Sequence, residues 1–480
     1  MHRRDFLADF GMGFTGLAMG AMLANDGVVR ADSIPSGEPH FPPRTKSIIW
    51  VFLSGGYSHV ETFDPKPALN QYAGKTLAET PFPNPVDSPL HRKRFRSVPA
   101  EEINVRDVYP KIYPMQVGYS RRGESGIEIT DWWPHLSECV DWISFVRNMW
   151  TTDNDHAAEN QIHTGRHRLD ETQPSIGAWA HYGLGSINEN LPRFVVLGGP
   201  TRSDTRASID SYYLGPEHAG VPLKLDPKNP LAFGTRQNTQ TAQQQSNEFE
   251  LVEELNRITA EANPHDQQIL ARIKSYELAY RMQRAVPGAV NLADEPSEVN
   301  QLYGVDETAT KVAGQRLLAA RRLVERGVRF VQVFPSPYGS WDSHKQLKDN
   351  HGKMCKSVDK PIAGLLKDLK RRGLMDDVTV VFCTEFGRTP GLEERAGGTT
   401  GRDHHPNGFT VWLAGAGVRG GHVHGATDEL GYHALGEGHY VTDLHATVLH
   451  LLGLDNSRLE VPGRRRLDID RGKVITDILA

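Results

Sequence analysis

Carboxylates and imidazoles, the groups that hold divalent cations, are concentrated in the stretch from Val378 to Phe409. Six residues of strand-forming type, Val378–Cys383, are followed closely by the carboxylate of Glu385. A Gly/Thr-rich loop then brings a second acid and two histidines, namely Asp403, His404 and His405. Open α/β sheets bind ligands just beyond the carboxyl ends of their strands, and these side-chain types suit a cation there. The stretch therefore predicts a metal site.

Similar side chains follow three other predicted strands, Ser47–Leu53, Trp142–Val146 and Val328–Phe334. In chain order they are His59, Asp64, Asp155, His156, Asp342 and His344. Mixed carboxylate and imidazole donors suit zinc, manganese or iron better than calcium, which prefers oxygen alone. We expect one or two ions, zinc or manganese in the first place, with calcium or magnesium as alternatives. Two cations about 4 Å apart would serve the hydrolysis of phosphate or sulfate esters.

Geometry and charge refine this candidate site. Adjacent histidines on a strand point to opposite faces, so His404 and His405 can both be ligands only on a loop. We expect one of them to be a ligand and the other a supporting group. Arg388 and Arg166 are expected to clamp a tetrahedral anion against the metals. Other histidines lie in Gly-rich loops and are expected to face solvent: His422, His424, His433 and His439.

Strand and helix patterns alternate along the chain, which indicates a three-layer α/β fold with a largely parallel central sheet. Thr308–Gly327 has the periodicity of an amphipathic helix and ends in a glycine suited to a helix C-terminus. In the range Pro216–Ala293, Leu251, Leu255 and Ile258 also have helical spacing. We expect this range to form a mostly helical insertion or lid on one side of the sheet.

The overall composition excludes several classes of protein. With 38% hydrophobic and 24% charged residues, the chain has the make-up of a soluble globular protein. Its net charge of −5 gives no basic footprint, so nucleic acid is not an expected partner. Three cysteines are too few for a disulfide framework or a thiolate zinc site.

The N-terminus has the pattern of an export signal, with the charged start RRDFL before an apolar run from Gly11 to Ala24. RRDFL resembles a twin-arginine signal, which is an address recognised by the export machinery. The run is short and Gly-rich for a stable membrane span, which needs about 20 residues. We predict a signal over 1–31, a linker over 32–44 and one α/β domain over 45–480. The expected destination is the periplasm or the extracellular space.

Six segments resemble the alkaline-phosphatase and sulfatase superfamily and, more narrowly, an uncharacterised family of bacterial twin-arginine-exported proteins. They are FLSGGYSHVETFDPKP (52–67), NDHAAENQIHTGRH (154–167), SWDSHKQ (340–346), TEFGRTP (384–390), GRDHHPNGF (401–409) and TDLHATVLHLLGLD (442–455). Together they span nearly the whole chain after the signal. The resemblance implies an alkaline-phosphatase-like fold and an anionic ester as substrate.

The resemblance also implies roles for particular residues. Its metal ligands would be Asp342 and His344, Glu385 at the strand end, His404 or His405, and His59 or Asp64. The chain departs from the superfamily at Asn154–His156, where neither Cys, Ser nor Thr stands in the place of the nucleophile and Thr152 is misplaced by a few residues. We therefore expect direct attack by metal-activated water, with His156 as base or ligand. The alternative is a non-catalytic metal- or ligand-binding protein on the same fold.

Overall fold

The computed structural model describes residue 35 and residues 37–90, 111–199, 203–231, 242–262, 280–393, 400–464 and 466–480. The signal predicted over 1–31 lies outside these residues, and so do two parts of the predicted insertion, 232–241 and 263–279. Among the helices that are described, none combines the length and the apolar character that a membrane crossing requires.

In the described part of the chain, nine strands form one central sheet. The order is β12-β4-β11-β8-β1-β7-β5-β6, and β13 also pairs with β4. The strands are β1 Ser47–Phe52, β4 Ile143–Trp150, β5 Phe194–Leu197, β6 Val221–Leu223, β7 Phe330–Val333, β8 Val378–Cys383, β11 Phe409–Gly415, β12 His422–His424 and β13 His439–Tyr440. From β8 to β6 all neighbours run parallel, whereas β11 runs antiparallel to both β8 and β4. The predicted, largely parallel sheet is confirmed.

Alternate side chains of the central strands enter two separate hydrophobic cores. On β1, Ile49 and Val51 belong to one core and Ile48 and Trp50 to the other, and every residue of this strand is buried. A strand covered on both faces has a continuous apolar sequence, which is why SIIWVF shows no alternation of apolar and polar residues.

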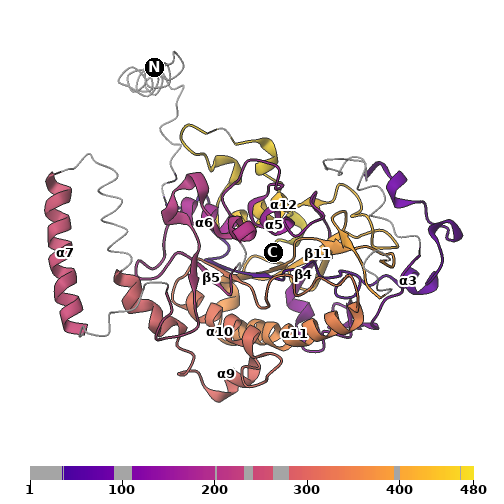
Figure 1. The fold of residues 1–480 in the computed structure, drawn as a ribbon, viewed down its shortest axis with the longest axis horizontal. Helices are drawn as coiled ribbons and strands as arrows, with labels where there is room; N and C mark the ends of the chain where they lie inside the picture. Colours follow the sequence, from indigo (N-terminus) through magenta and orange to yellow (C-terminus); the bar gives the residue numbers. More distant parts are fainter. Residues whose placement is uncertain are drawn as a thin grey trace, which may run out of the picture.

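Helices cover both faces of the sheet and complete three layers (Figure 1). On one face lie α10 (Lys311–Glu325) and α11 (Leu347–Arg371). On the other lie α5 (Ala158–Thr164), α6 (Ile176–Leu184) and α12 (Val441–Leu451). The three-layer α/β prediction is therefore confirmed, and the predicted helix over 308–327 is α10.

The remaining α-helices and strands of the described residues lie outside the central sheet and the five helices named above. They are α3 (Pro67–Gln71), the hairpin β2 (Tyr119–Arg122) and β3 (Ile127–Thr130), α7 (Ala242–Ala262), α9 (Ser297–Leu302), and the two-residue strands β9 (Gly387–Arg388) and β10 (His404–His405). Within the predicted insertion, β6 extends the sheet at its edge, while α7 stands apart from the body (Figure 1). A lid function for this range remains a prediction.

Candidate metal centre

Loops after three neighbouring strands meet at one edge of the sheet. Gly55 follows β1, Asp342 lies in the loop after β7, and Glu385 comes two residues after β8. Because these strands are parallel neighbours, their carboxyl ends lie together. Gly55 has φ of +117°, and a Cβ there would lie 2.5 Å from the backbone nitrogen of Asp342. A glycine is therefore needed for the loops to approach this closely.

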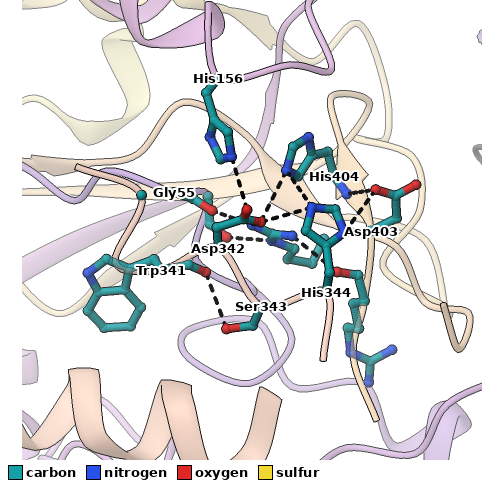
Figure 2. Close-up of polar contacts among 12 residues, drawn as sticks. Gly55, His156, Trp341, Asp342, Ser343, His344, Asp403 and His404 are labelled. Atoms are coloured by element: carbon teal, nitrogen blue, oxygen red, sulfur yellow. Dashed lines mark hydrogen bonds and ion pairs between the residues drawn. The ribbon is translucent and has the colours of Figure 1, made fainter. Parts of the chain in front are cut away.

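Asp342 occupies the middle of the candidate metal centre (Figure 2). Its Oδ2 lies 3.2 Å from Nε2 of His156. Its Oδ1 lies 3.0 Å from Nε2 of His344, 3.2 Å from Nε2 of His404 and 2.7 Å from Nη2 of Arg388. Burial disfavours the charged carboxylate, but hydrogen bonds from the imidazoles and the charge of Arg388 outweigh it. They hold the pKa of Asp342 far below its usual range.

The second nitrogen of each imidazole faces a hydrogen-bond acceptor. These acceptors are Glu385 for His156 (3.1 Å), Glu393 for His344 (2.5 Å) and the backbone oxygen of Asn154 for His404 (2.7 Å). A carboxylate or carbonyl at Nδ1 requires a proton there, which directs Nε2 toward Asp342. Metal-binding histidines are held and oriented in this way.

His404 supplies the strongest sign that a cation belongs here. Its Nδ1–H donates to Asn154, so in the neutral ring Nε2 carries a lone pair, and this lone pair lies 3.2 Å from Oδ1 of Asp342. Two lone pairs at that separation repel unless a cation lies between them. A second proton on the His404 ring could in principle be that cation. Burial lowers the pKa of His404, however, and so disfavours the doubly protonated ring.

The spacing of the donors also fits a metal. Oδ1 of Asp342, Nε2 of His344 and Nε2 of His404 lie 3.0–3.2 Å from one another. Ligands at about 2.0 Å from a tetrahedral zinc ion are about 3.3 Å apart. Asp403 approaches Nδ1 of His344 at 3.4 Å. Two overlapping groups have all their ligand atoms within 4.8 Å, and they share His404: His156, Asp342 and His404, and His344, Asp403 and His404. One cation, or two adjacent ones, can be held by these residues.

Glu385 lies behind His156 and belongs to neither of these groups. It is fully buried, and its oxygens accept hydrogen bonds from the backbone of Gly55 (2.7 Å), from Thr384 (2.9 Å) and from His156. Burial alone would raise its pKa, but these hydrogen bonds and the charge of His156 lower it. Glu385 therefore lies where it orients His156 through Nδ1. It was predicted to be a metal ligand itself, but it belongs to neither group of candidate ligands.

Three predicted ligands are not brought to the centre. Each is buried and bonded elsewhere: His59 to the Gly431 carbonyl (2.8 Å), Asp64 to Lys66 (3.0 Å), and His405 to the Tyr432 carbonyl. His404 and His405 form the short strand β10, so their side chains leave on opposite faces. This explains why only one of the pair reaches Asp342.

The two arginines of the predicted anion clamp have different partners in the structure. Arg388 is fully buried, and its donors go to Asp342 and to the backbone oxygens of Gly55, Gly56 and Arg402. A buried guanidinium needs such partners, and here they take up four of its five N–H donors. Arg166 makes a two-point ion pair with Asp470 in a separate pocket of about 490 Å³.

Glu393 is the residue that the sequence patterns missed. It is buried and pairs with His344, forming a carboxylate–histidine unit like that of Glu385 and His156. It follows no strong strand and has no motif spacing to another ligand, so only the folded chain reveals its position. Its neighbours 394–399 lie outside the described residues.

The metal-free centre should make stability depend on pH. Burial lowers the pKa of both His156 and His344, but hydrogen bonds to Asp342 and to Glu385 or Glu393 outweigh it, raising the values from 6.5 to about 10 and about 9. A raised pKa in the folded state stabilises below pH 6.5, and this stabilisation is lost as pH rises through the folded-state values. Urea unfolding of chelator-treated protein at about pH 6, 8 and 10 should show a falling free energy of unfolding, with a smaller fall for His156→Gln. A rise over this range, or an unchanged slope in the variant, would contradict the assignment.

Fold and site together define a three-layer α/β protein with an acid-and-imidazole centre at the carboxyl edge of its sheet. A family model described as "Protein of unknown function (DUF1501)" matches residues 45–479, so the chain belongs to this family. No curated protein sequence matches the chain.

Several solved structures are distantly similar in fold. The lipoteichoic acid synthase LtaP from Listeria monocytogenes matches with a TM-score of 0.39 and 9% identity, covering 92% of this chain and 79% of its own. The phosphonate monoester hydrolase SpPMH from Silicibacter pomeroyi has a TM-score of 0.34 and 11% identity, covering 70% and 73%. The alkaline phosphatase from the Antarctic bacterium TAB5 has a TM-score of 0.32 and 9% identity, covering 85% and 98%.

Proposed function

We propose that this protein is an exported, metal-dependent hydrolase of phosphate or sulfate esters. The observation that carries the proposal is the convergence of three imidazole Nε2 atoms on Asp342, with an acceptor at each Nδ1. Metal ligands need such fixed tautomers, whereas histidines that only fill space in a core do not.

In this proposal, one set of residues binds the metal ion and another set transfers protons. Asp342, His344 and His404 would hold the cation through atoms on one side of the Asp342 carboxylate, leaving a fourth position open for water or substrate. A divalent cation bound there supplies a Lewis acid for the ester oxygen and lowers the pKa of water toward neutrality. Zinc or manganese suits this donor set.

His156 and Glu385 would move the proton. Glu385 holds Nδ1–H of His156, which leaves Nε2 directed at Oδ2 of Asp342, on the other side of that carboxylate. A positioned imidazole of this kind accepts a proton from water or gives one to a leaving oxygen. The side-chain partners of Asp342 among the described residues are three imidazoles and one guanidinium, with no hydroxyl or thiol. Direct attack by water therefore fits better than a covalent intermediate.

Activity assays with matched variants test this proposal. The purified protein would be assayed on p-nitrophenyl phosphate, bis-p-nitrophenyl phosphate and p-nitrophenyl sulfate, before and after chelation and after return of zinc or manganese. We expect turnover of at least one ester that is lost with the metal and restored with it. We expect His344→Gln to lose metal and turnover together, and His156→Gln to lose turnover while keeping metal.

A second candidate is a metal-binding protein without hydrolytic activity. Arg388 favours it, because this guanidinium is buried and four of its five N–H donors are already bonded within the protein, which leaves little of it to clamp a tetrahedral anion. Stoichiometric metal with no turnover of any ester would support this candidate against the hydrolase.

Export by the twin-arginine route rests on RRDFL, which lies outside the described residues. Replacing Arg3 and Arg4 by lysine is expected to retain the protein in the cytoplasm of a bacterial host, because the receptor recognises the arginine pair. Fractionation of cells that produce each form measures this. Equal export of both forms would rule out the twin-arginine route.

A further inference from the structure

A second group of histidines lies on the short edge strands β12 and β13, which pair with β4, and its residues are distinct from those of the candidate metal centre. Strands β12 and β13 pair with β4 one after the other, which places His424 opposite Val146 and His439 opposite Met149. Between His422 and His424, Val423 packs against the hydrophobic core. Side chains alternate along a strand, so His422 and His424 share the opposite face. The predicted solvent-facing loops are thus short strands, and these histidines are partly buried; His433 is buried and bonded to the Pro85 carbonyl.

His424 and His439 face each other through the same ring atom. Their Nε2 atoms are 2.8 Å apart, and the ring centroids are 5.0 Å apart. At the other side of each ring a carboxylate receives Nδ1–H: Asp477 for His424 (3.2 Å) and Asp443 for His439 (3.0 Å). Asp443 is itself fixed, because its second oxygen accepts the backbone N–H of Lys473 at 2.8 Å.

The two facing Nε2 atoms, each with a carboxylate behind its ring, form a suitable place for a cation between the rings. With a proton on each Nδ1, two neutral imidazoles present a pair of lone pairs at 2.8 Å, which repel unless a shared proton or a metal ion lies between them. A carboxylate behind each ring, with the free nitrogens converging, is the arrangement that supports histidine ligands of metals. The side chains of His424 and His439 are 17% and 20% exposed, so water can complete the coordination of an ion there.

We propose that His424 and His439 bind a divalent transition-metal ion of the zinc, nickel or copper type through their Nε2 atoms. Imidazole is a preferred donor for these ions, and calcium or magnesium would prefer oxygen. His422, on the same strand as His424, would supply a third nitrogen ligand to this ion after rotation of its side chain. In the described part of the chain its Nε2 is buried without a hydrogen-bond partner, so this turn breaks no hydrogen bond at that atom. The ion would join β12, β13, α12 and the C-terminal segment that carries Asp477.

Counting bound metal tests the site independently of any hydrolysis. Zinc would be titrated into the metal-free full chain in competition with a chromophoric chelator. We expect the double variant His424→Gln/His439→Gln to bind one equivalent fewer than the wild type and to hydrolyse esters at the wild-type rate. In copper-loaded protein, electron paramagnetic resonance should lose one nitrogen-ligated signal in this variant.

Single variants keep the test decisive if the double variant folds poorly. Asp443→Asn removes only the support behind His439 and should weaken this second equivalent about 10–100-fold. His135→Gln is the matched control, because His135 is exposed and belongs to neither histidine group; it should leave the number of equivalents unchanged. The same number of equivalents and the same affinity in wild type, double variant and Asp443→Asn would overturn the proposal.

Discussion

Replacing Asp342 with asparagine is expected to weaken metal binding by more than about 100-fold and to bring ester hydrolysis to the background rate. The carboxylate is the shared anionic partner of His156, His344 and His404, so its charge is needed to hold both a cation and the imidazoles. Loss of a supporting group alone costs about 10–100-fold in metal affinity, and loss of a ligand should cost more. Competition with a chelator gives the affinity, and a p-nitrophenyl ester gives the rate.

Asp306→Asn is the control for this exchange, since Asp306 is exposed and lies outside the centre. It should change neither the affinity nor the rate. The metal-free Asp342→Asn protein should keep its circular dichroism spectrum, because Arg388 retains three backbone carbonyl partners. Full metal affinity in Asp342→Asn would remove this residue from the ligand set.

Replacing Glu61 with glutamine is expected to destabilise the metal-free protein by about 3–5 kcal/mol, because it leaves a buried guanidinium without its counter-charge. Arg402 and Glu61 are both fully buried, and Nη2 of Arg402 lies 2.7 Å from Oε1 of Glu61. Arg402 directly precedes Asp403 and His404, so the same ion pair anchors the loop that supplies the late ligands. Urea unfolding measures the change in the free energy of unfolding.

An exposed ion pair provides the comparison for Glu61. Arg121 and Glu128 lie 3.4 Å apart on the β2–β3 hairpin, where solvent screens their charges. Glu128→Gln should shift the free energy of unfolding by less than about 1 kcal/mol. An equal loss in the free energy of unfolding for Glu61→Gln and Glu128→Gln would show that burial does not strengthen the contribution of the Glu61–Arg402 pair to stability.

Much of the fold could be predicted because its signals are local. The apolar run over 378–383 is β8, and the run over 47–53 is β1 with one residue fewer. The periodicity over 308–327 is α10. The short edge strands β6, β12 and β13 could not be found in this way. They contain two or three residues each and arise from pairing with β5 or β4, which are distant in the sequence.

For the candidate site, too, some residue positions could be predicted from the sequence and others could not. Asp342, His344 and His404 were predicted together, because the loops that follow neighbouring parallel strands reach the same edge of the sheet. The positions of His59, Arg166 and Glu393 depend instead on single distant contacts. These contacts are with Gly431, Asp470 and His344, respectively. No periodicity or spacing in the chain encodes such pairings, and a buried arginine with a bonding partner has the same sequence signature as one that binds an anion.

Anomalous diffraction at the zinc edge, from crystals of the zinc-loaded protein, tests the central claim most directly. The structure predicts a peak with Oδ1 of Asp342, Nε2 of His344 and Nε2 of His404 at about 2.0–2.2 Å from it. The peak should be absent from crystals of His344→Gln. Zinc-loaded wild-type crystals with no peak among these three atoms would contradict the metal centre and the hydrolase built on it.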